Sequence, residues 1–292
     1  MDVAVVRRRG VGNRNQVSVR RKHDTPSGNL LTLPLLYRMP LTFWLVTEPS
    51  RTRRAGFSRK PPAKLQSLIV LDGNQLRGVV TDWGGVMTTP ILTTVRAWVQ
   101  ADSIDWDTYA AVMRPWVFGA YENADQEAQQ NPVHVLERGE CSNADFEVML
   151  AARLKTVAGG PVVAEGLLKR MFSAALPVPA MYRVIRTLRG AGFSTALLSN
   201  SWGCDEYPRA DFPGLFDTVV ISGEVGMRKP EPEIFRHAAA TLGLEPGECV
   251  FIDDVEANIA AAKACGMAGV HHTDPAVTAR ELESLLGVQL AS

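Results

Sequence analysis

The C-terminal part of the chain alternates short apolar segments with segments of helical period, and this alternation constrains the fold more than any other feature. Strand-like apolar segments occur at residues 194–198, 216–222, 249–254 and 268–272, and helical segments at 181–189, 233–242 and 257–265. Strands that alternate with helices of this length indicate βαβ units. The sequence therefore predicts an α/β fold built on a doubly wound parallel sheet.

A first strand is expected much earlier in the chain, and a helical block separates it from the others. Helical periods recur through residues 91–178 without strand-like alternation. Within this block, Ser142 is followed three residues later by Asp145, a spacing typical of a helix start. We therefore predict a core of residues 76–90 and 179–292, into which residues 91–178 are inserted as an all-helical cap.

The formal net charge of zero hides an uneven distribution. Residues 1–64 hold fourteen Lys and Arg against three Asp and Glu, whereas the rest of the chain holds seventeen against twenty-eight. Because the body is acidic, no nucleic-acid partner is expected. We interpret residues 1–75 as a basic, disordered leader. An annotated start that lies too far upstream is the alternative.

Neither a membrane nor a metal-thiolate role is expected. The apolar stretch at residues 30–46 is interrupted by two prolines and an arginine, which argues against a membrane span or a signal peptide. The four cysteines show no CxxC and no metal-ligand spacing, so they are interpreted as reduced thiols of a cytoplasmic protein. The sequence carries no signal for the oligomeric state.

Polar residues follow the apolar segments at several points. Asp82 follows V79-V80-T81, the pair Ser199-Asn200 follows A196-L197-L198, and the pair Asp253-Asp254 follows V250-F251-I252. Lys229 lies in the loop before the helical segment that begins near Glu233. Open parallel sheets bind ligands beyond the carboxyl ends of their strands. We expect these side chains to meet at that edge.

These residue types together are suited to phosphoryl transfer. A carboxylate such as Asp82 can attack phosphorus and form an aspartyl-phosphate intermediate. The negative charges involved need a cation, and Mg²⁺ prefers oxygen ligands of the kind that Asp82, Asp253 and Asp254 offer. Ser199 can donate a hydrogen bond to phosphoryl oxygens, and Lys229 can stabilise the charge that develops on them.

The order of these motifs resembles the haloacid dehalogenase superfamily. The chain contains D82-W-G-G-V, L197-L-S-N-S-W, K229-P-E-P-E-I-F and F251-I-D-D with Asn258 following, which are similar to the four motifs of that family. The resemblance covers roughly residues 77–290, with the helical block where that family inserts a cap. Within the family, D82-W-G-G-V and S199-N-S-W more closely resemble the subgroup that includes the N-terminal phosphatase domain of soluble epoxide hydrolase.

The resemblance assigns roles to matching positions. It implies that Asp82 is the nucleophile and a metal ligand and that Lys229 stabilises charge. Asp254 is implied as the direct Mg²⁺ ligand and Asp253 as a supporting one.

Further positions follow from the same resemblance. It implies that Ser199 binds phosphate and that Asn258 orients the metal shell. Asn200 is placed against the substrate, and for Trp202 substrate contact and plain packing remain alternatives.

One position departs from the family pattern. Active phosphatases of this family commonly carry a second aspartate two residues after the nucleophile, where this chain has Gly84. The Gly84 carbonyl can still ligate Mg²⁺, but it cannot protonate a leaving group. General acid–base help is worth about 10²–10⁴-fold, so slow turnover is one expectation.

The leading hypothesis is a Mg²⁺-dependent phosphatase of small phosphorylated metabolites. An impaired domain that binds a phosphorylated ligand or a protein partner is the main alternative, because of Gly84. A haloalkanoate dehalogenase is less favoured, since it needs no metal and has no use for the Asp253-Asp254 pair. A phosphonate-cleaving enzyme needs a cap lysine, for which Lys155 and Lys169 lack a supporting motif.

Overall fold

The computed structural model describes residues 70–71, 74–117, 131–203 and 207–290. The predicted leader lies outside these residues except for residues 70–71 and 74–75, which form the short antiparallel strands β1 (Val70–Leu71) and β2 (Asn74–Gln75). Cys141, Cys249 and Cys265 are free thiols, and Cys204 lies outside the described residues.

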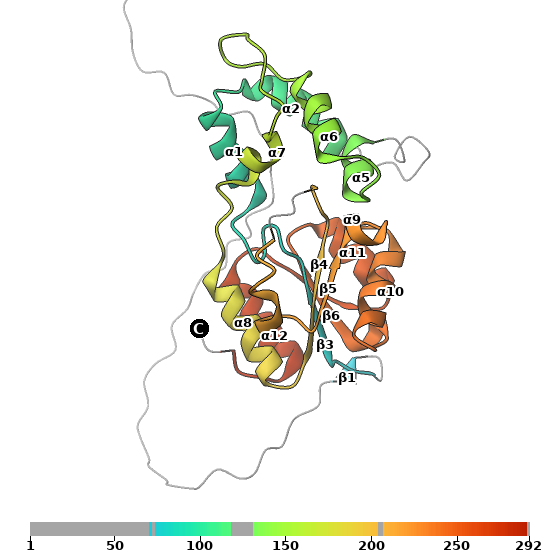
Figure 1. Cartoon of the computed structure of the whole chain (residues 1–292). Coiled ribbons are helices and arrows are strands. Elements are labelled where there is room, and N and C mark those ends of the chain that lie inside the picture. Colours follow the sequence, from blue (N-terminus) through green and yellow to red (C-terminus); the bar gives the residue numbers. More distant parts are fainter. Residues whose placement is uncertain (1–69, 72–73, 118–130, 204–206, 291–292) are drawn as a thin grey trace, which may run out of the picture. The chain divides into compact units, whose positions relative to one another are not determined.

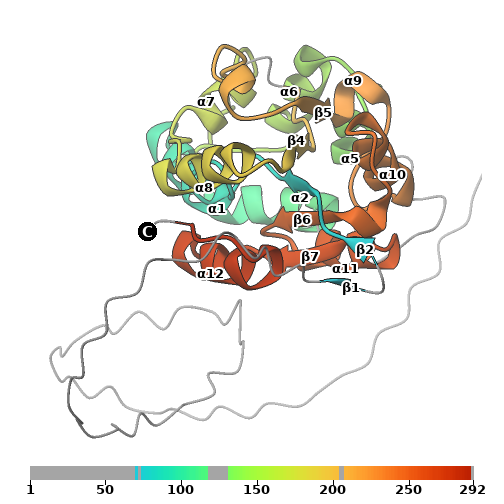
Figure 2. The same cartoon turned by 90° about the horizontal axis from the view of Figure 1, so that it is seen from below.

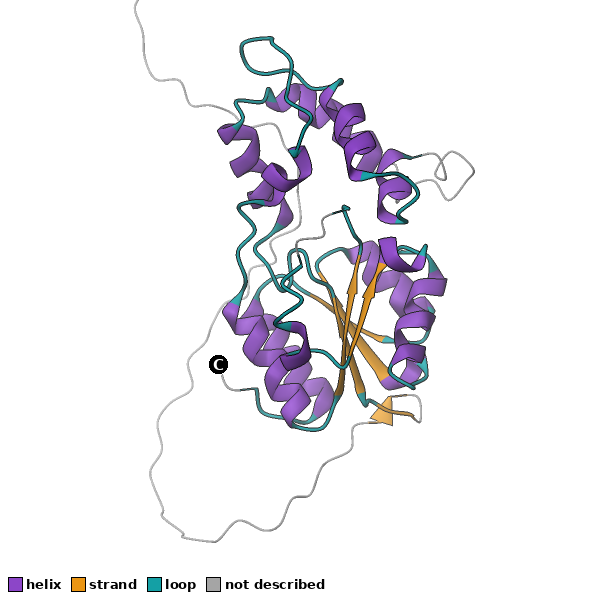
Figure 3. Cartoon of the chain, viewed as in Figure 1, coloured by secondary structure: helices purple, strands orange, loops and turns teal. Residues whose placement is uncertain are grey.

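A five-stranded parallel sheet forms the centre of the core. Its strands stand in the order β5-β4-β3-β6-β7 and point the same way in Figure 3. They are β3 (Gly78–Thr81), β4 (Ser194–Ser199), β5 (Thr218–Ile221), β6 (Cys249–Asp253) and β7 (Ala268–His271). The predicted doubly wound α/β fold is confirmed.

Helices cover both faces of this sheet. Figures 1 and 2 show α8 (Pro179–Gly190) and α12 (Pro275–Leu286) on one side of the sheet and α10 (Pro232–Thr241) on the other, and α11 (Glu256–Ala264) packs with α10. The short elements η1 (Phe212–Gly214), α9 (Ser222–Val225) and η2 (Pro246–Glu248) lie in the connections. The sequence reasoning did not anticipate α12.

The apolar strand sequences divide between these two layers because successive side chains of a strand point to opposite faces. Val79 packs in the cluster that includes α8 and α12, and its neighbour Val80 packs in the cluster that includes α10 and α11. In β6, Ile252 belongs to the first cluster and Phe251 to the second. Continuous apolar runs are what a sheet buried on both faces requires.

The block between β3 and β4 is helical. Among the described residues of this block, the helices are α1 (Ile91–Ala101), α2 (Trp106–Val117), α5 (Pro132–Glu137), α6 (Asn143–Ala151) and α7 (Leu167–Phe172). They surround their own apolar cluster, with Trp98 and Phe146 among its fully buried members. The predicted helix start is also present, because the Ser142 side chain accepts a hydrogen bond from the Asp145 amide at 3.1 Å.

Candidate active site

The strand register brings Asp82 beside Asp253. Asp82 follows the central strand β3 directly, and Asp253 is the last residue of the adjacent β6. Thr81 pairs with Ile252, and the Asp82 amide donates to the Ile252 carbonyl at 2.8 Å. Since parallel strands end at the same edge of a sheet, the two aspartates meet there although they are far apart in sequence.

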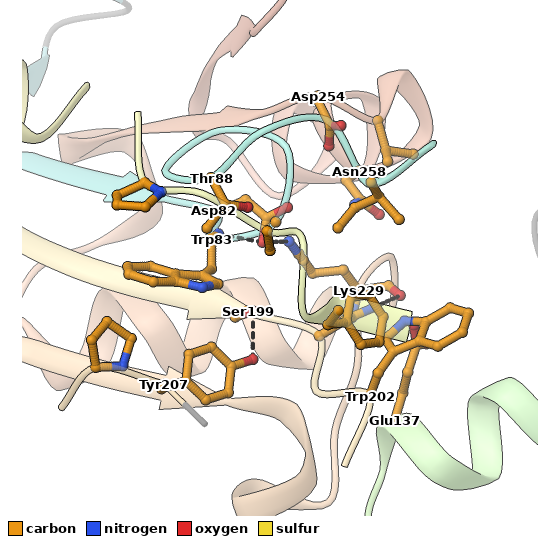
Figure 4. Close-up of a pocket in the computed structure, with 18 of the residues that line it drawn as sticks. Asp82, Trp83, Thr88, Glu137, Ser199, Trp202, Tyr207, Lys229, Asp254 and Asn258 are labelled. Carbon is orange, nitrogen blue, oxygen red and sulfur yellow. Dashed lines mark hydrogen bonds and ion pairs between the residues drawn. The ribbon is translucent and has the colours of Figure 1, made fainter. Parts of the chain in front are cut away.

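Lys229 joins these two carboxylates. Its Nζ atom lies 2.8 Å from Asp82 Oδ1 and 2.7 Å from Asp253 Oδ2. A dashed line in Figure 4 marks the contact with Asp82. The lysine side chain is only 1% exposed. A buried ammonium is stable only when paired, and here both partners are candidate site residues.

The two residues of the acidic pair have different surroundings. Asp253 is fully buried, and its carboxylate accepts bonds from the Val255 amide at 2.8 Å and from Asn258 Nδ2 at 3.0 Å, besides Lys229. Asp254 is only partly buried, and its side chain lies against the backbone of Gly85. The Asp253 carboxylate is therefore largely satisfied by the protein, whereas Asp254 is freer to bind an added group.

Gly85 is required where Asp254 approaches the backbone. It has a φ of +80°, and a Cβ there would lie 2.2 Å from Asp254 Oδ2. Any other residue would be strained in this conformation and would collide with the carboxylate. The second glycine of the opening motif thus makes room for the acidic pair.

Burial and neighbouring charges shift the pKa values of Asp82, Asp254 and Lys229. The pKa of Asp82 is raised to about 8, chiefly because burial penalises its charged form; Lys229 lowers it, and the charges of Asp253 and Asp254 raise it. The pKa of Asp254 is raised to about 6, first by burial and then by Asp253. Burial lowers the pKa of Lys229, but Asp253 and Asp82 more than offset this and raise it above its usual value.

The donor set fits a hard divalent cation. Among the described residues, Asp82, Asp253 and Asp254 offer carboxylate oxygens that all lie within 4.8 Å of one another. Beside them, within the described part of the chain, Asn258 Oδ1 is buried without a hydrogen-bond partner. Oxygen ligands of this kind suit Mg²⁺, and a cation here would offset the carboxylate repulsion.

Ser199 and Asn200 lie at the end of β4, beside β3. The Ser199 Oγ atom is 2.9 Å from the Tyr207 hydroxyl, and both residues line the same cavity as Asp82. The Asn200 amide brackets the backbone of Lys229: Nδ2 donates to the Lys229 carbonyl at 3.0 Å, and Oδ1 accepts from its amide at 2.8 Å. Asn200 therefore fixes the lysine as well as lining the cavity.

A cavity of about 610 Å³ opens onto this cluster. Much of its wall is apolar and aromatic, and residues on both the core and the helical block contribute to it: Trp83, Ile91, Val117, Val133, Phe172, Tyr182, Trp202 and Tyr207. Trp202 also packs against Phe172 and Phe146, with ring centroids 5.8 and 6.3 Å away. The packing of Trp202 is therefore observed, and its contact with a substrate stays a prediction.

Sequence reasoning missed several polar residues of the cavity wall. Glu137 and Arg228 form a buried ion pair, although they are 91 positions apart in sequence. Arg228 could have been suspected because it precedes Lys229. Glu137 lies at the end of α5, where the sequence holds no catalytic motif, and only the tertiary structure brings it to the site.

The model of the haloacid dehalogenase-like hydrolase family matches residues 76–266. The chain belongs to this family. The resemblance found in the sequence is thereby confirmed, and the chain is a haloacid dehalogenase-like hydrolase with phosphatases among its relatives.

Two curated relatives illustrate the range of the family. The bifunctional epoxide hydrolase 2 of Sus scrofa is 31% identical over 229 residues, which cover 74% of this chain and 40% of that protein. A sesquiterpene phosphatase of Aspergillus oryzae is 33% identical over 114 residues, covering 38% of this chain and 58% of that protein. The chain therefore spans well under half the length of the epoxide hydrolase.

A solved structure of a predicted haloacid dehalogenase-like hydrolase from Porphyromonas gingivalis has the same fold. It matches with a TM-score of 0.50 at 24% identity, and the match covers 71% of this chain and 98% of that one.

Within the described residues, no helix combines the length and the apolar character needed to span a bilayer.

Proposed function

We propose that the chain is a Mg²⁺-dependent phosphatase of small phosphorylated metabolites that works through an aspartyl-phosphate on Asp82. The observation that carries the proposal is the contact of Lys229 Nζ with both Asp82 and Asp253 at 2.8 and 2.7 Å, beside the partly free Asp254. This arrangement combines a candidate nucleophile, a buried cation and oxygen ligands at one end of the cavity. The identities of these site residues are part of the proposal.

In the proposed reaction, the Asp82 carboxylate attacks phosphorus, and the bond from phosphorus to the ester oxygen breaks. Lys229 stabilises the charge on the phosphoryl oxygens, and Ser199 donates a hydrogen bond to them. The leaving alkoxide takes a proton from water, because Gly84 offers no acid. Water then hydrolyses the aspartyl-phosphate, which releases inorganic phosphate and restores Asp82.

Asp82, Asp253 and Asp254 are the proposed ligands of Mg²⁺, with the Gly84 carbonyl as a further one. When bound, the ion supplies positive charge against the phosphoryl group and the carboxylates. Asp82 must be ionised to attack, and in this crowded cluster its pKa is raised to about 8. The Asn258 amide holds Asp253 in place through Nδ2.

The walls of the cavity favour substrates with an apolar organic group. Trp83, Phe172 and Trp202 would contact that group while the phosphate lies near Asp82. The similarity to a sesquiterpene phosphatase supports the same substrate class. We therefore include phosphate monoesters of apolar alcohols among the proposed substrates.

The test is phosphate release by the purified full chain from an aryl phosphate and from a panel of sugar and apolar alkyl phosphates. We expect turnover that requires Mg²⁺, stops with EDTA and is abolished in Asp82→Asn. The matched control is Asp217→Asn, an aspartate of the core surface outside the cavity, which should keep its activity. Turnover retained by Asp82→Asn would contradict the proposed nucleophile.

Gly84 favours a second candidate, a domain that binds phosphorylated ligands without turning them over. In that case the wild-type chain would bind phosphate esters in calorimetry, and none of the panel would be hydrolysed. Halide release from a 2-haloalkanoate without metal would instead support dehalogenation, which the acidic cluster does not favour.

A further inference from the structure

The helical block contacts the loop of the proposed catalytic lysine through a buried ion pair. Arg228 Nε lies 2.5 Å from Glu137 Oε2, and the two side chains are only 3% and 5% exposed. Glu137 is the last residue of α5, whereas Arg228 immediately precedes Lys229. Two opposite charges buried together are costly to separate, because each would remain desolvated without its partner.

Other contacts strengthen the same junction. The Glu137 carbonyl accepts a bond from the buried Ser222 hydroxyl at 2.5 Å. The next residue, Arg138, reaches Glu231 at 3.2 Å, and the Arg228 amide also donates to Glu231 at 3.2 Å. The C-terminal end of α5 thus holds both ends of the short segment from Arg228 to Glu231.

Lys229 lies within that segment. Its backbone is bracketed by the Asn200 amide, and its ammonium joins Asp82 to Asp253. A displacement of Arg228 would therefore be passed along one peptide to the lysine. Since effective transition-state stabilisation requires accurate placement, an error of about 1 Å can cost about 10²-fold in rate.

We infer that Glu137 is a positioning residue, which holds the loop of Lys229 in its productive place through Arg228 whenever α5 is docked. The inference rests on the proposed phosphatase function. It gives the helical block a role in the chemistry that adds to its contribution to the cavity wall. Separation of α5 from the core would withdraw Glu137 and loosen the lysine.

The test compares Glu137→Gln with Glu147→Gln in the full chain. Glu147 is also a buried glutamate of the helical block, but its carboxylate accepts from the Gly166 and Leu168 amides and does not line the cavity. Both substitutions therefore make the same chemical change, and both remove a buried carboxylate from the helical block. Of the two variants, only Glu137→Gln removes the charge that pairs with Arg228.

We expect Glu137→Gln to lower kcat for an aryl phosphate by about 10–100-fold with a smaller change in KM, because Lys229 acts on charge in the transition state. Glu147→Gln should retain kcat within about threefold, since it leaves that geometry unchanged.

Hydrogen exchange supplies a readout that does not depend on activity. The amides of Arg228, Lys229 and Glu231 are all hydrogen-bonded, and they should exchange faster in Glu137→Gln but not in Glu147→Gln. Unchanged exchange at these amides, or equal losses of kcat in both variants, would overturn the inference. A wild-type chain without phosphatase activity would refute the proposed function, whereas the exchange experiment would still test the contact.

Discussion

Two adjacent glycines of the loop after β3, in the candidate active site, carry different constraints. Gly85 has a φ of +80° and faces the Asp254 carboxylate, so no side chain fits there. Gly84 has no such positive φ, and a Cβ at this position would meet only the flexible end of Ile91, 2.9 Å from Cδ1. The backbone geometry at residue 84 therefore does not explain why the chain has a glycine there instead of an acidic residue.

The substitution Gly84→Asp should therefore provide the missing general acid. We expect kcat for an alkyl phosphate, whose leaving group needs a proton, to rise by at least about 10-fold, because a well-placed general acid supplies about 10²–10⁴-fold. An aryl phosphate should respond much less. Gly84→Asn is the matched control, because it has the same shape without an acidic proton. An equal rise in kcat in Gly84→Asp and Gly84→Asn, or no rise in either, would contradict the view that the chain lacks a general acid at residue 84.

At the scale of elements, two short helices of the helical block, α5 and α6, each begin after a residue whose side chain caps the helix. The Ser142 hydroxyl accepts from the Asp145 amide at the start of α6, and the Asn131 side chain accepts from the Val133 amide at the start of α5. Helices of this length are marginal alone. Their end contacts therefore contribute to the placement of Glu137.

Ser142→Ala should destabilise the protein by about 1 kcal/mol because it leaves an amide of the first helical turn without its acceptor. That corresponds to a fall in Tm of roughly 2–4 °C for a protein of this size. Ser142→Gly is the control, since glycine at this position costs only a few tenths of a kcal/mol. Thermal unfolding followed by circular dichroism measures both. Equal losses for alanine and glycine would show that capping is not the cause.

At the scale of the whole molecule, the buried Asp82 of the candidate active site lowers the stability of the folded protein as pH rises. The pKa of Asp82 is raised from 3.8 to about 8 by folding. Between these values the folded protein holds a proton that the unfolded chain has released, so stability is present at low pH and is lost as pH rises toward 8. A bound divalent cation would offset this loss, because ligands that bind only the folded state stabilise it.

We therefore expect Asp82→Asn to raise Tm in EDTA, by an amount that grows as pH rises from 5 to 8.5. Adding Mg²⁺ should raise the wild-type Tm and reduce the difference in Tm between Asp82→Asn and the wild type. The measurement is thermal unfolding of both proteins across this range. A difference that does not depend on pH would contradict the assignment of the raised pKa.

Asp217→Asn provides a control of opposite sign. The pKa of Asp217 is lowered, because hydrogen bonds from the Thr195 amide and from Arg189, together with the Arg189 charge, outweigh the effect of burial. Its contribution to stability is present above 3.8 and is lost as pH falls through its lower folded value. This variant should therefore be less stable than the wild type at pH 7, and the deficit should vanish toward acid pH.

Much of the core could be predicted because its signals are local. Apolar runs in β3, β4 and β6 mark strands buried on both faces, and an aspartate after each of two such runs marks a ligand edge. Parallel topology then brings Asp82 and Asp253 together without further information. The terminal helix α12 was not anticipated, although it packs on the same layer as α8.

The sequence by itself determined the α/β fold and the family, because periodicity and motif order are properties of short segments. It also predicts the helical insertion. The position of Asp82, Asp253 and Lys229 at one sheet edge followed from those same properties. Only the tertiary structure decided that Glu137 meets Arg228 and that Trp202 packs on Phe172. Such contacts depend on how the cap helices dock on the core, and that docking is the sum of many side-chain contacts between segments far apart in the chain.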